Sequence, residues 1–211
     1  MNLPNAITVA RILVCPVIFV LTLSTGVGTL FGAFVLYLGA SLSDLWDGYL
    51  ARKYGLVTDV GKLLDPLADK LLLVATFIPF YIVSHRPDGL GEVPGWGALP
   101  LWVLLVVFGR ELLVTLFRSW AARRGTIISA GPSGKFKTLL QSLFSGGLLL
   151  WYPLVRMAEA GDWTGPVWTI WSVVHGAFVA MTLAAAVVLT VYSMLVYFWE
   201  YYAQQRPAAG S

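Results

Sequence analysis

Four aspartates stand at helical spacings in a chain that otherwise holds few charged residues. Asp44 and Asp47 are three residues apart and Asp65 and Asp69 are four apart, so on helices each pair shares a face. Carboxylates gathered in an apolar protein repel one another unless a cation lies among them or they are protonated. Because ligand sets made only of oxygen favour hard ions such as Mg²⁺ or Mn²⁺, the pattern predicts a metal site, for one or two cations.

Small residues accompany the aspartates at the same stride. Gly48 and Ala51 follow Asp44 by four and seven positions, and Gly61 precedes Asp65 by four. Such a stripe allows helix backbones to approach closely, or leaves room for a flat ligand beside the metals. From residue types alone the two interpretations are equally supported. Helix-end acids can also be solvated at a membrane interface, which is our interpretation of Asp59.

The elements that position these residues are membrane helices. Of the 211 residues 58% are hydrophobic and 12% charged, and the mean hydropathy is +0.77, which indicates a membrane protein and not a soluble one. We therefore expect an all-α, polytopic helix bundle in a single domain over 1–211, with about six transmembrane helices. The expected spans are 6–25, 28–51, 64–84, 99–121, 136–157 and 166–199.

Basic residues gather in the loops after the second and fourth spans. Such a bias places these loops in the cytoplasm. The aspartates then lie at the cytoplasmic end of an antiparallel helix pair, where a hairpin brings Asp44 and Asp47 opposite Asp65 and Asp69. The basic residues are Arg52, Lys53, Lys62, Arg118, Arg123, Arg124, Lys135 and Lys137.

The pattern Asp-x2-Asp-Gly-x2-Ala-Arg-x8-Gly-x3-Asp-x3-Asp over 44–69 resembles the signature of the CDP-alcohol phosphotransferase family, integral membrane enzymes that make phospholipids. The resemblance implies two divalent cations, Mg²⁺ or Mn²⁺, held by Asp44, Asp47, Asp65 and Asp69. It also implies that the face with small residues holds the cytidine nucleotide of a CDP-activated lipid. Asp69 is then our choice for the base that takes the proton of the acceptor hydroxyl.

Further nucleotide contacts follow from the same resemblance. Arg52 suits the pyrophosphate, although a positive-inside anchor is its alternative role. The segment Pro4-Asn5-x2-Thr8-x2-Arg11 is similar to one that often precedes the signature. Helix capping is an alternative for Asn5, and snorkelling alone could explain Arg11. The predicted nucleotide and CDP-lipid contacts are Asn5, Thr8, Gly48, Ala51, Arg52, Thr58 and Gly61.

A second cluster of charge begins with Arg110-Glu111 inside an apolar span. A membrane-embedded arginine needs an anion, and Glu111, adjacent in sequence, projects from a different helical face, which leaves Arg110 free for another partner. We expect four cations to form a pocket for a phosphate dianion, with positive-inside topology as the alternative for the two lysines. The four are Arg110, Arg118, Lys135 and Lys137.

The stretches around Arg110, Gly134–Gln141 and Leu64–Lys70 resemble the branch of the family that makes phosphatidylglycerol phosphate. The implied reaction joins CDP-diacylglycerol and glycerol 3-phosphate and releases CMP. The resemblance also implies a homodimer in the inner membrane of a bacterium, with the active site facing the cytoplasm. No nucleic-acid partner is expected.

Three alternatives compete with this interpretation. The nearest keeps the family and changes the acceptor to phosphatidylglycerol, an inositol phosphate or serine, of which serine fits a cationic pocket least. A cation-coupled transporter would place its acids at mid-membrane near broken helices, whereas these acids lie at a helix end beside a basic loop. A scaffold without activity would have no need for acids in the membrane.

Overall fold

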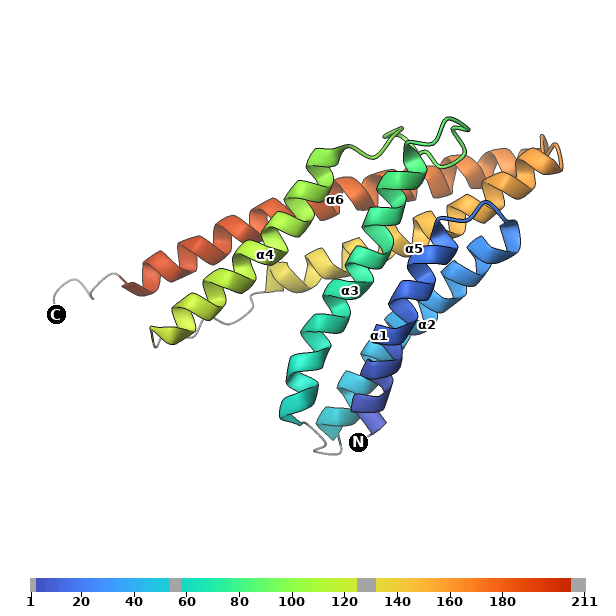
Figure 1. Ribbon diagram of the computed structural model, residues 1–211. Helices are drawn as coiled ribbons and strands as arrows, with labels where there is room; N and C mark the ends of the chain where they lie inside the picture. The colour runs from blue at the N-terminus through green and yellow to red at the C-terminus, as the bar shows by residue number, and fades with distance from the viewer. Residues whose placement is uncertain (1–2, 54–57, 125–131, 206–211) are drawn as a thin grey trace. The chain divides into compact units, whose positions relative to one another are not determined.

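The computed structural model describes residues 3–53, 58–124 and 132–205. This part of the chain forms six helices (Figure 1). Each of the six expected spans falls on a helix, and the observed helix ends differ from the expected ones by up to six residues. The helices are α1 (Leu3–Thr22), α2 (Val27–Lys53), α3 (Asp59–Ser84), α4 (Leu101–Arg123), α5 (Pro132–Ala160) and α6 (Pro166–Gln205).

Five of the described helices are long and apolar enough to cross a membrane, and α4 is the exception. The reason is its charge, because Arg110, Glu111 and Arg118 all fall within any 18-residue stretch of this helix. Charges inside a membrane helix are costly unless they are paired or face the protein interior. The helix that is least suited to lipid on all sides is therefore the one that carries the predicted phosphate site.

The described residues group into two compact units, and α5 and α6 each contribute to both. Unit 1 comprises Met1–Leu99 and Ser145–Phe178. Within it, α1 packs against both α2 and α3, as the first three helices of Figure 1 show. Its core includes the fully buried rings of Phe80 and Tyr152, whose centroids are 5.9 Å apart in an edge-on arrangement.

The segment between α3 and α4 closes the end of unit 1 that lies opposite the start of α3. The Ser84 hydroxyl joins the two ends of this segment, because it accepts a hydrogen bond from the Leu99 amide at 2.9 Å. Arg156 pairs with Asp88 at 3.0 Å. Gly97, at φ +69°, bridges to Val93 in a tight turn, a backbone conformation that favours glycine.

Unit 2 comprises Pro100–Phe144 and Val179–Ser211, so it holds α4 with the first part of α5 and the second part of α6. Its apolar core is a group of buried side chains from α4 and α6, with Phe117 packed against it: Val114, Ala121, Tyr197 and Tyr201. The Phe117 ring meets Tyr201 edge-on at 4.8 Å between centroids. Such aromatic pairs add to the free energy gained from burial alone.

Candidate active site

Three of the four motif aspartates have described side chains, Asp44 near the end of α2 and Asp65 and Asp69 in the first turns of α3. The Asp44 side chain is 45% exposed and the Asp69 side chain 54% exposed. These carboxylates are therefore half open to solvent or to a ligand. Helix α3 starts at Asp59, six positions after α2 ends at Lys53, and Asp44 and Asp69 both contact Arg11, so the two halves of the motif meet in unit 1.

Arg11 of α1 joins the two halves. Its Nη1 lies 2.6 Å from Asp44 Oδ1 and 3.3 Å from Asp69 Oδ1, and its side chain is fully buried. One guanidinium thus donates to a carboxylate from α2 and to a carboxylate from α3. The interpretation of Arg11 as a snorkelling residue is wrong, since the side chain turns inward to an ion pair and not outward to water.

Polar residues three positions apart on α1 form a row of contacts along α3. Asn5, Thr8 and Arg11 share a helix face because of this spacing. The Thr8 hydroxyl donates to Asp65 Oδ1 at 3.0 Å. With the contact from Arg11 to Asp69, the row fixes the register of α1 against the helix that carries the second pair of aspartates.

Asn5 and Thr58 form the outer end of this row. The Asn5 amide donates to Thr58 Oγ1 at 2.9 Å, and the Thr58 hydroxyl lies 3.0 Å from Asn5 Oδ1. Thr58 is also the N-cap of α3, where its hydroxyl accepts from the Gly61 amide at 3.0 Å. Asn5 lies inside α1, so its alternative role as an N-cap is wrong. Their predicted contact with a nucleotide stays a prediction.

Gly61 has a packing role that the sequence alone left open. A Cβ at this position would lie 2.9 Å from Asn5 Oδ1 and 3.2 Å from Thr58 Oγ1. A Cβ here would displace the Asn5 amide and disturb its hydrogen bond with Thr58. Glycine here permits the close approach of the two helices, and room for a ligand stays an additional prediction.

Several predicted contacts fall on residues whose side chains lie outside the described part of the chain. Asp47, Gly48, Ala51 and Arg52 belong to α2. Their predicted roles in holding a metal, the nucleotide and the pyrophosphate are therefore predictions that the geometry does not address.

The acidic end of unit 1 offers donors that suit a hard cation. The side chains of Asp44, Asp65 and Asp69 are oxygen ligands, the type that Mg²⁺ and Mn²⁺ prefer. Among the described residues there is no group of three or more His, Cys, Asp or Glu side chains arranged to hold a metal ion. Instead the Arg11 guanidinium supplies the positive charge between two of the carboxylates. By donor chemistry the residues fit divalent cations.

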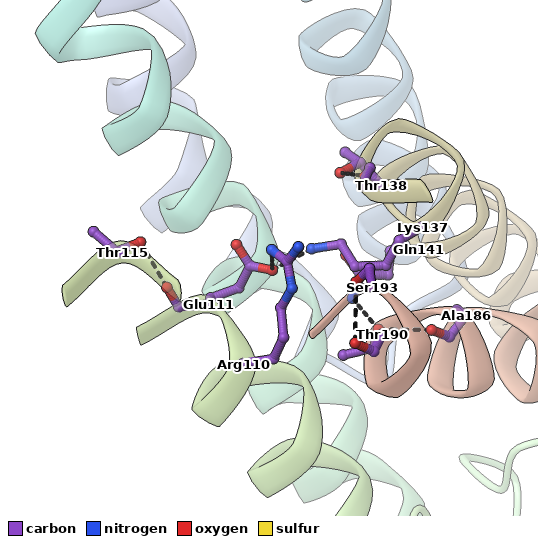
Figure 2. Close-up of polar contacts among 10 residues, drawn as sticks. Arg110, Glu111, Thr115, Lys137, Thr138, Gln141, Ala186, Thr190 and Ser193 are labelled. Carbon is purple, nitrogen blue, oxygen red and sulfur yellow. Dashed lines mark hydrogen bonds and ion pairs between the residues drawn. The ribbon is translucent and has the colours of Figure 1, made fainter. Parts of the chain in front are cut away.

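The second site lies in unit 2, where Figure 2 shows Arg110 and Lys137 reaching Glu111 from α4 and α5. Arg110 Nη1 lies 3.1 Å from Glu111 Oε1, and Lys137 Nζ donates to the same oxygen. The expectation that Glu111 would leave Arg110 free is wrong. Long side chains at adjacent positions can fold toward each other even though their Cα–Cβ bonds point to different faces.

In the described ion pairs of this cluster, two cations share one carboxylate, which gives this trio one unit of net positive charge. Lys137 is 3% exposed, and Arg110 Nε is buried with no hydrogen-bond partner among the described residues. One turn along α5, the Gln141 amide donates to Thr190 Oγ1 of α6 at 3.4 Å. A buried cluster with surplus positive charge and an unused N–H group is able to bind an anion.

The other two predicted phosphate ligands have different surroundings. The Arg118 guanidinium lies over the Tyr197 ring at 5.9 Å from its centroid, and Lys135 is exposed on α5. Of the four predicted cations, the structure therefore brings Arg110 and Lys137 together at Glu111. A phosphate contact from Arg118 or Lys135 stays a prediction.

Sequence reasoning did not assign a role at the site to Arg11 or Glu111. For Arg11 a signal was present, because its spacing of three from Thr8 and six from Asn5 places all three on one helix face. For Glu111 the only feature that pointed to a role was its place beside an arginine in a membrane span. Glu111 pairs with a lysine 26 residues away, and no sequence pattern predicts that contact.

Known proteins similar to this chain include members of a single enzyme family. A family profile described as CDP-alcohol phosphatidyltransferase matches residues 1–199. A Bacillus subtilis (strain 168) protein named CDP-diacylglycerol–glycerol-3-phosphate 3-phosphatidyltransferase is 38% identical over 162 residues, which are 71% of this chain and 77% of the relative. A Rickettsia typhi protein of the same name is 37% identical over 150 residues, 71% of this chain and 76% of the relative. A probable phosphatidylglycerophosphate synthase of Mycobacterium tuberculosis (strain ATCC 25618 / H37Rv) is 36% identical over 194 residues, 90% of this chain and 77% of the relative.

Proposed function

Because this chain belongs to the CDP-alcohol phosphatidyltransferase family, we propose that it transfers the phosphatidyl group of CDP-diacylglycerol to glycerol 3-phosphate, with phosphatidylglycerol phosphate and CMP as products. The names of its relatives carry the choice of acceptor. The observation in the structure that supports this choice is the cluster at Glu111, whose surplus positive charge suits an acceptor that carries a phosphate.

In this reaction a hydroxyl oxygen of the acceptor bonds to the phosphorus of the phosphatidyl group. The bond between that phosphorus and the oxygen bridging to CMP breaks, and CMP leaves with the bridging oxygen. The hydroxyl proton needs an acceptor, for which we assign Asp69. Its carboxylate is half exposed, and the Arg11 guanidinium at 3.3 Å holds it in place, so its usefulness as a base comes from its position.

We propose that Asp44, Asp47, Asp65 and Asp69 hold two divalent cations, Mg²⁺ or Mn²⁺. The fit of the oxygen donors supports this proposal, together with the way Thr8 and Arg11 restrain three of the carboxylates. When bound, such cations supply charge neutralisation for the pyrophosphate and for the departing CMP. The Thr8 hydroxyl donates to Asp65 at 3.0 Å and so orients this carboxylate before a cation binds. Asp65 then loses less side-chain entropy when it binds the cation.

For the acceptor phosphate we assign Arg110 and Lys137 as the main ligands. Glu111 holds both cations by one oxygen and so keeps them close without neutralising both. Serine carries no phosphate and would leave the surplus charge unpaired, which disfavours it as the acceptor. The same cluster would admit an inositol phosphate or a phosphatidylglycerol, so these are the outcomes that an assay must separate.

Several long apolar helices and bacterial relatives indicate an integral membrane protein. We propose the inner membrane of a bacterium as its location, with the acidic site facing the cytoplasm, because Lys and Arg gather in the loops at that end. A homodimer is a further proposal, and it comes from the family resemblance alone.

The test is CMP release by the purified protein in detergent with CDP-diacylglycerol and Mg²⁺ or Mn²⁺. Glycerol 3-phosphate, phosphatidylglycerol, an inositol phosphate and serine are offered separately. The proposal predicts metal-dependent release with glycerol 3-phosphate alone. Release with a different acceptor would overturn the assignment of the Glu111 cluster, and no release from folded protein with any acceptor would overturn the proposed reaction.

A further inference from the structure

A hollow on unit 2 is not used by the proposed reaction. It has a volume of about 470 Å³ and lies between α4 and α6, and we name it the α4–α6 groove. It is a shallow, wide-open groove and not an enclosed cavity, and the leucines along it are exposed. Every lining side chain is apolar or aromatic: Leu113, Leu116, Phe117, Trp120 and Phe198.

Aromatic packing between α4 and α6 holds the two sides of the groove together. The Phe117 ring meets Phe198 edge-on at 5.0 Å between centroids, which joins the two helices across its floor. Leu113 is 51% exposed and Leu116 58% exposed, so they form the open rim. A row of apolar side chains along two packed helices suits an extended hydrocarbon chain, since it offers contact without any hydrogen-bonding group to satisfy.

One end of the groove is basic. Helix α4 ends in Arg123 and is followed by its C-cap Arg124. The Arg124 guanidinium lies over the Trp120 ring, 4.1 Å from its centroid, a distance typical of cation–π contacts. Because Trp120 is itself a wall of the groove, this contact holds a cation at the groove's end. Arg123, one position earlier, is exposed and has no such ring beneath it among the described contacts.

We propose that the α4–α6 groove binds one anionic phospholipid, with an acyl chain along the apolar walls and the headgroup phosphate beside Arg124. The argument is charge complementarity, because the groove has one apolar length and one cationic end, as the ligand has one apolar chain and one anionic end. A zwitterionic lipid has the same chain but no net charge, so it gains less at the cationic end. The inference uses none of the residues assigned to the reaction and does not depend on the proposed function.

The experiment is native mass spectrometry of the full-length protein in detergent, with equimolar phosphatidylglycerol and phosphatidylcholine of matched acyl chains. We expect one phosphatidylglycerol per protomer to be retained in preference to phosphatidylcholine. Arg124→Gln should lower that preference about fivefold, the factor for one cation near an anionic headgroup. Arg123→Gln is the matched control, with the same change of charge one residue away, and should lower the preference less than Arg124→Gln does, because Arg123 does not lie over the Trp120 ring that lines the groove.

A second pair of variants tests the groove itself. Leu116→Trp fills the groove and should abolish retention of the lipid, whereas Leu112→Trp adds the same ring at a position that is 60% exposed and not part of the lining. Equal retention of the two lipids by the native sequence would overturn the proposal. Equal effects of the two arginine variants, or full retention of the lipid by Leu116→Trp, would also overturn it. A lipid-free dimer that Leu116→Trp dissociates would overturn it too, because a second copy of the chain would then occupy the groove.

Discussion

The contact of Arg11 with two carboxylates predicts how the protein responds when that charge is removed. In Arg11→Gln the side chain keeps most of its volume and loses the guanidinium that lies 2.6 Å from Asp44 and 3.3 Å from Asp69. Both carboxylates then lose this guanidinium, and α1 loses its ion pairs with α2 and α3. We expect the unfolding midpoint of the metal-free protein to fall.

The expected size lies between two limits. Breaking a fully buried ion pair costs about 3–5 kcal/mol, and breaking an exposed pair costs roughly 0.2–1 kcal/mol. The Arg11 side chain is fully buried, but its two partners are 45% and 54% exposed, so solvent screens much of the interaction. A loss of roughly 1–3 kcal/mol in the free energy of unfolding follows.

The assay is denaturant unfolding in detergent, followed by helical signal, with and without Mg²⁺. The variant should be less stable than the native sequence without the ion, and Mg²⁺ should stabilise it more than it stabilises the native protein, because the freed carboxylates need a cation. Arg156→Gln is the control, since it breaks another Arg–Asp pair of unit 1 away from the motif. An unchanged midpoint in Arg11→Gln would refute the role of the ion pair, and an equal response to Mg²⁺ would refute the link between Arg11 and a metal site.

Three further predictions follow from single contacts. Glu111→Gln removes the carboxylate shared by Lys137, which is buried, and Arg110, which is 12% exposed. We expect the free energy of unfolding to fall by roughly 2 kcal/mol and added inorganic phosphate to stabilise the variant more than the native protein. Equal stabilisation would count against an anion site. Gly61→Ala places a Cβ 2.9 Å from Asn5 Oδ1, so the Asn5 amide must shift and its hydrogen bond to Thr58 weakens. In denaturant unfolding this variant should be less stable by about 1 kcal/mol than Gly39→Ala, which meets no atom within 4 Å. Asp69→Asn should abolish CMP release and leave nucleotide binding largely intact, as measured by calorimetry; unimpaired turnover would refute its role as the base.

The helices were predictable because their signal is local. A run of apolar residues long enough to span a membrane is read directly along the chain, and the predicted ends of the runs lie within six residues of the ends of α1–α6. The pairing of acids at helical spacing was predictable for the same reason. In α3 the spacing of four between Asp65 and Asp69 places both near Arg11 and Thr8 of α1.

The contacts that cross between helices were not predictable from periodicity. Whether Arg11 points to lipid headgroups or to Asp44 depends on the rotation of α1, which one helix's sequence does not determine. The same is true of Glu111, whose ion pair with Lys137 depends on where α5 places that lysine relative to α4. For Gly61 the residue type left two interpretations open, and the distance to Asn5 supports the packing role.

The central claim is transfer of a phosphatidyl group to a hydroxyl of glycerol 3-phosphate. The most direct measurement uses glycerol 3-phosphate with ¹⁸O in its free hydroxyl groups and follows both products by mass spectrometry. The account predicts phosphatidylglycerol phosphate that retains all of the ¹⁸O, with none in CMP, and no such product from Asp69→Asn. Phosphatidic acid and unreacted, labelled glycerol 3-phosphate would show that water is the acceptor, and this result would contradict the account.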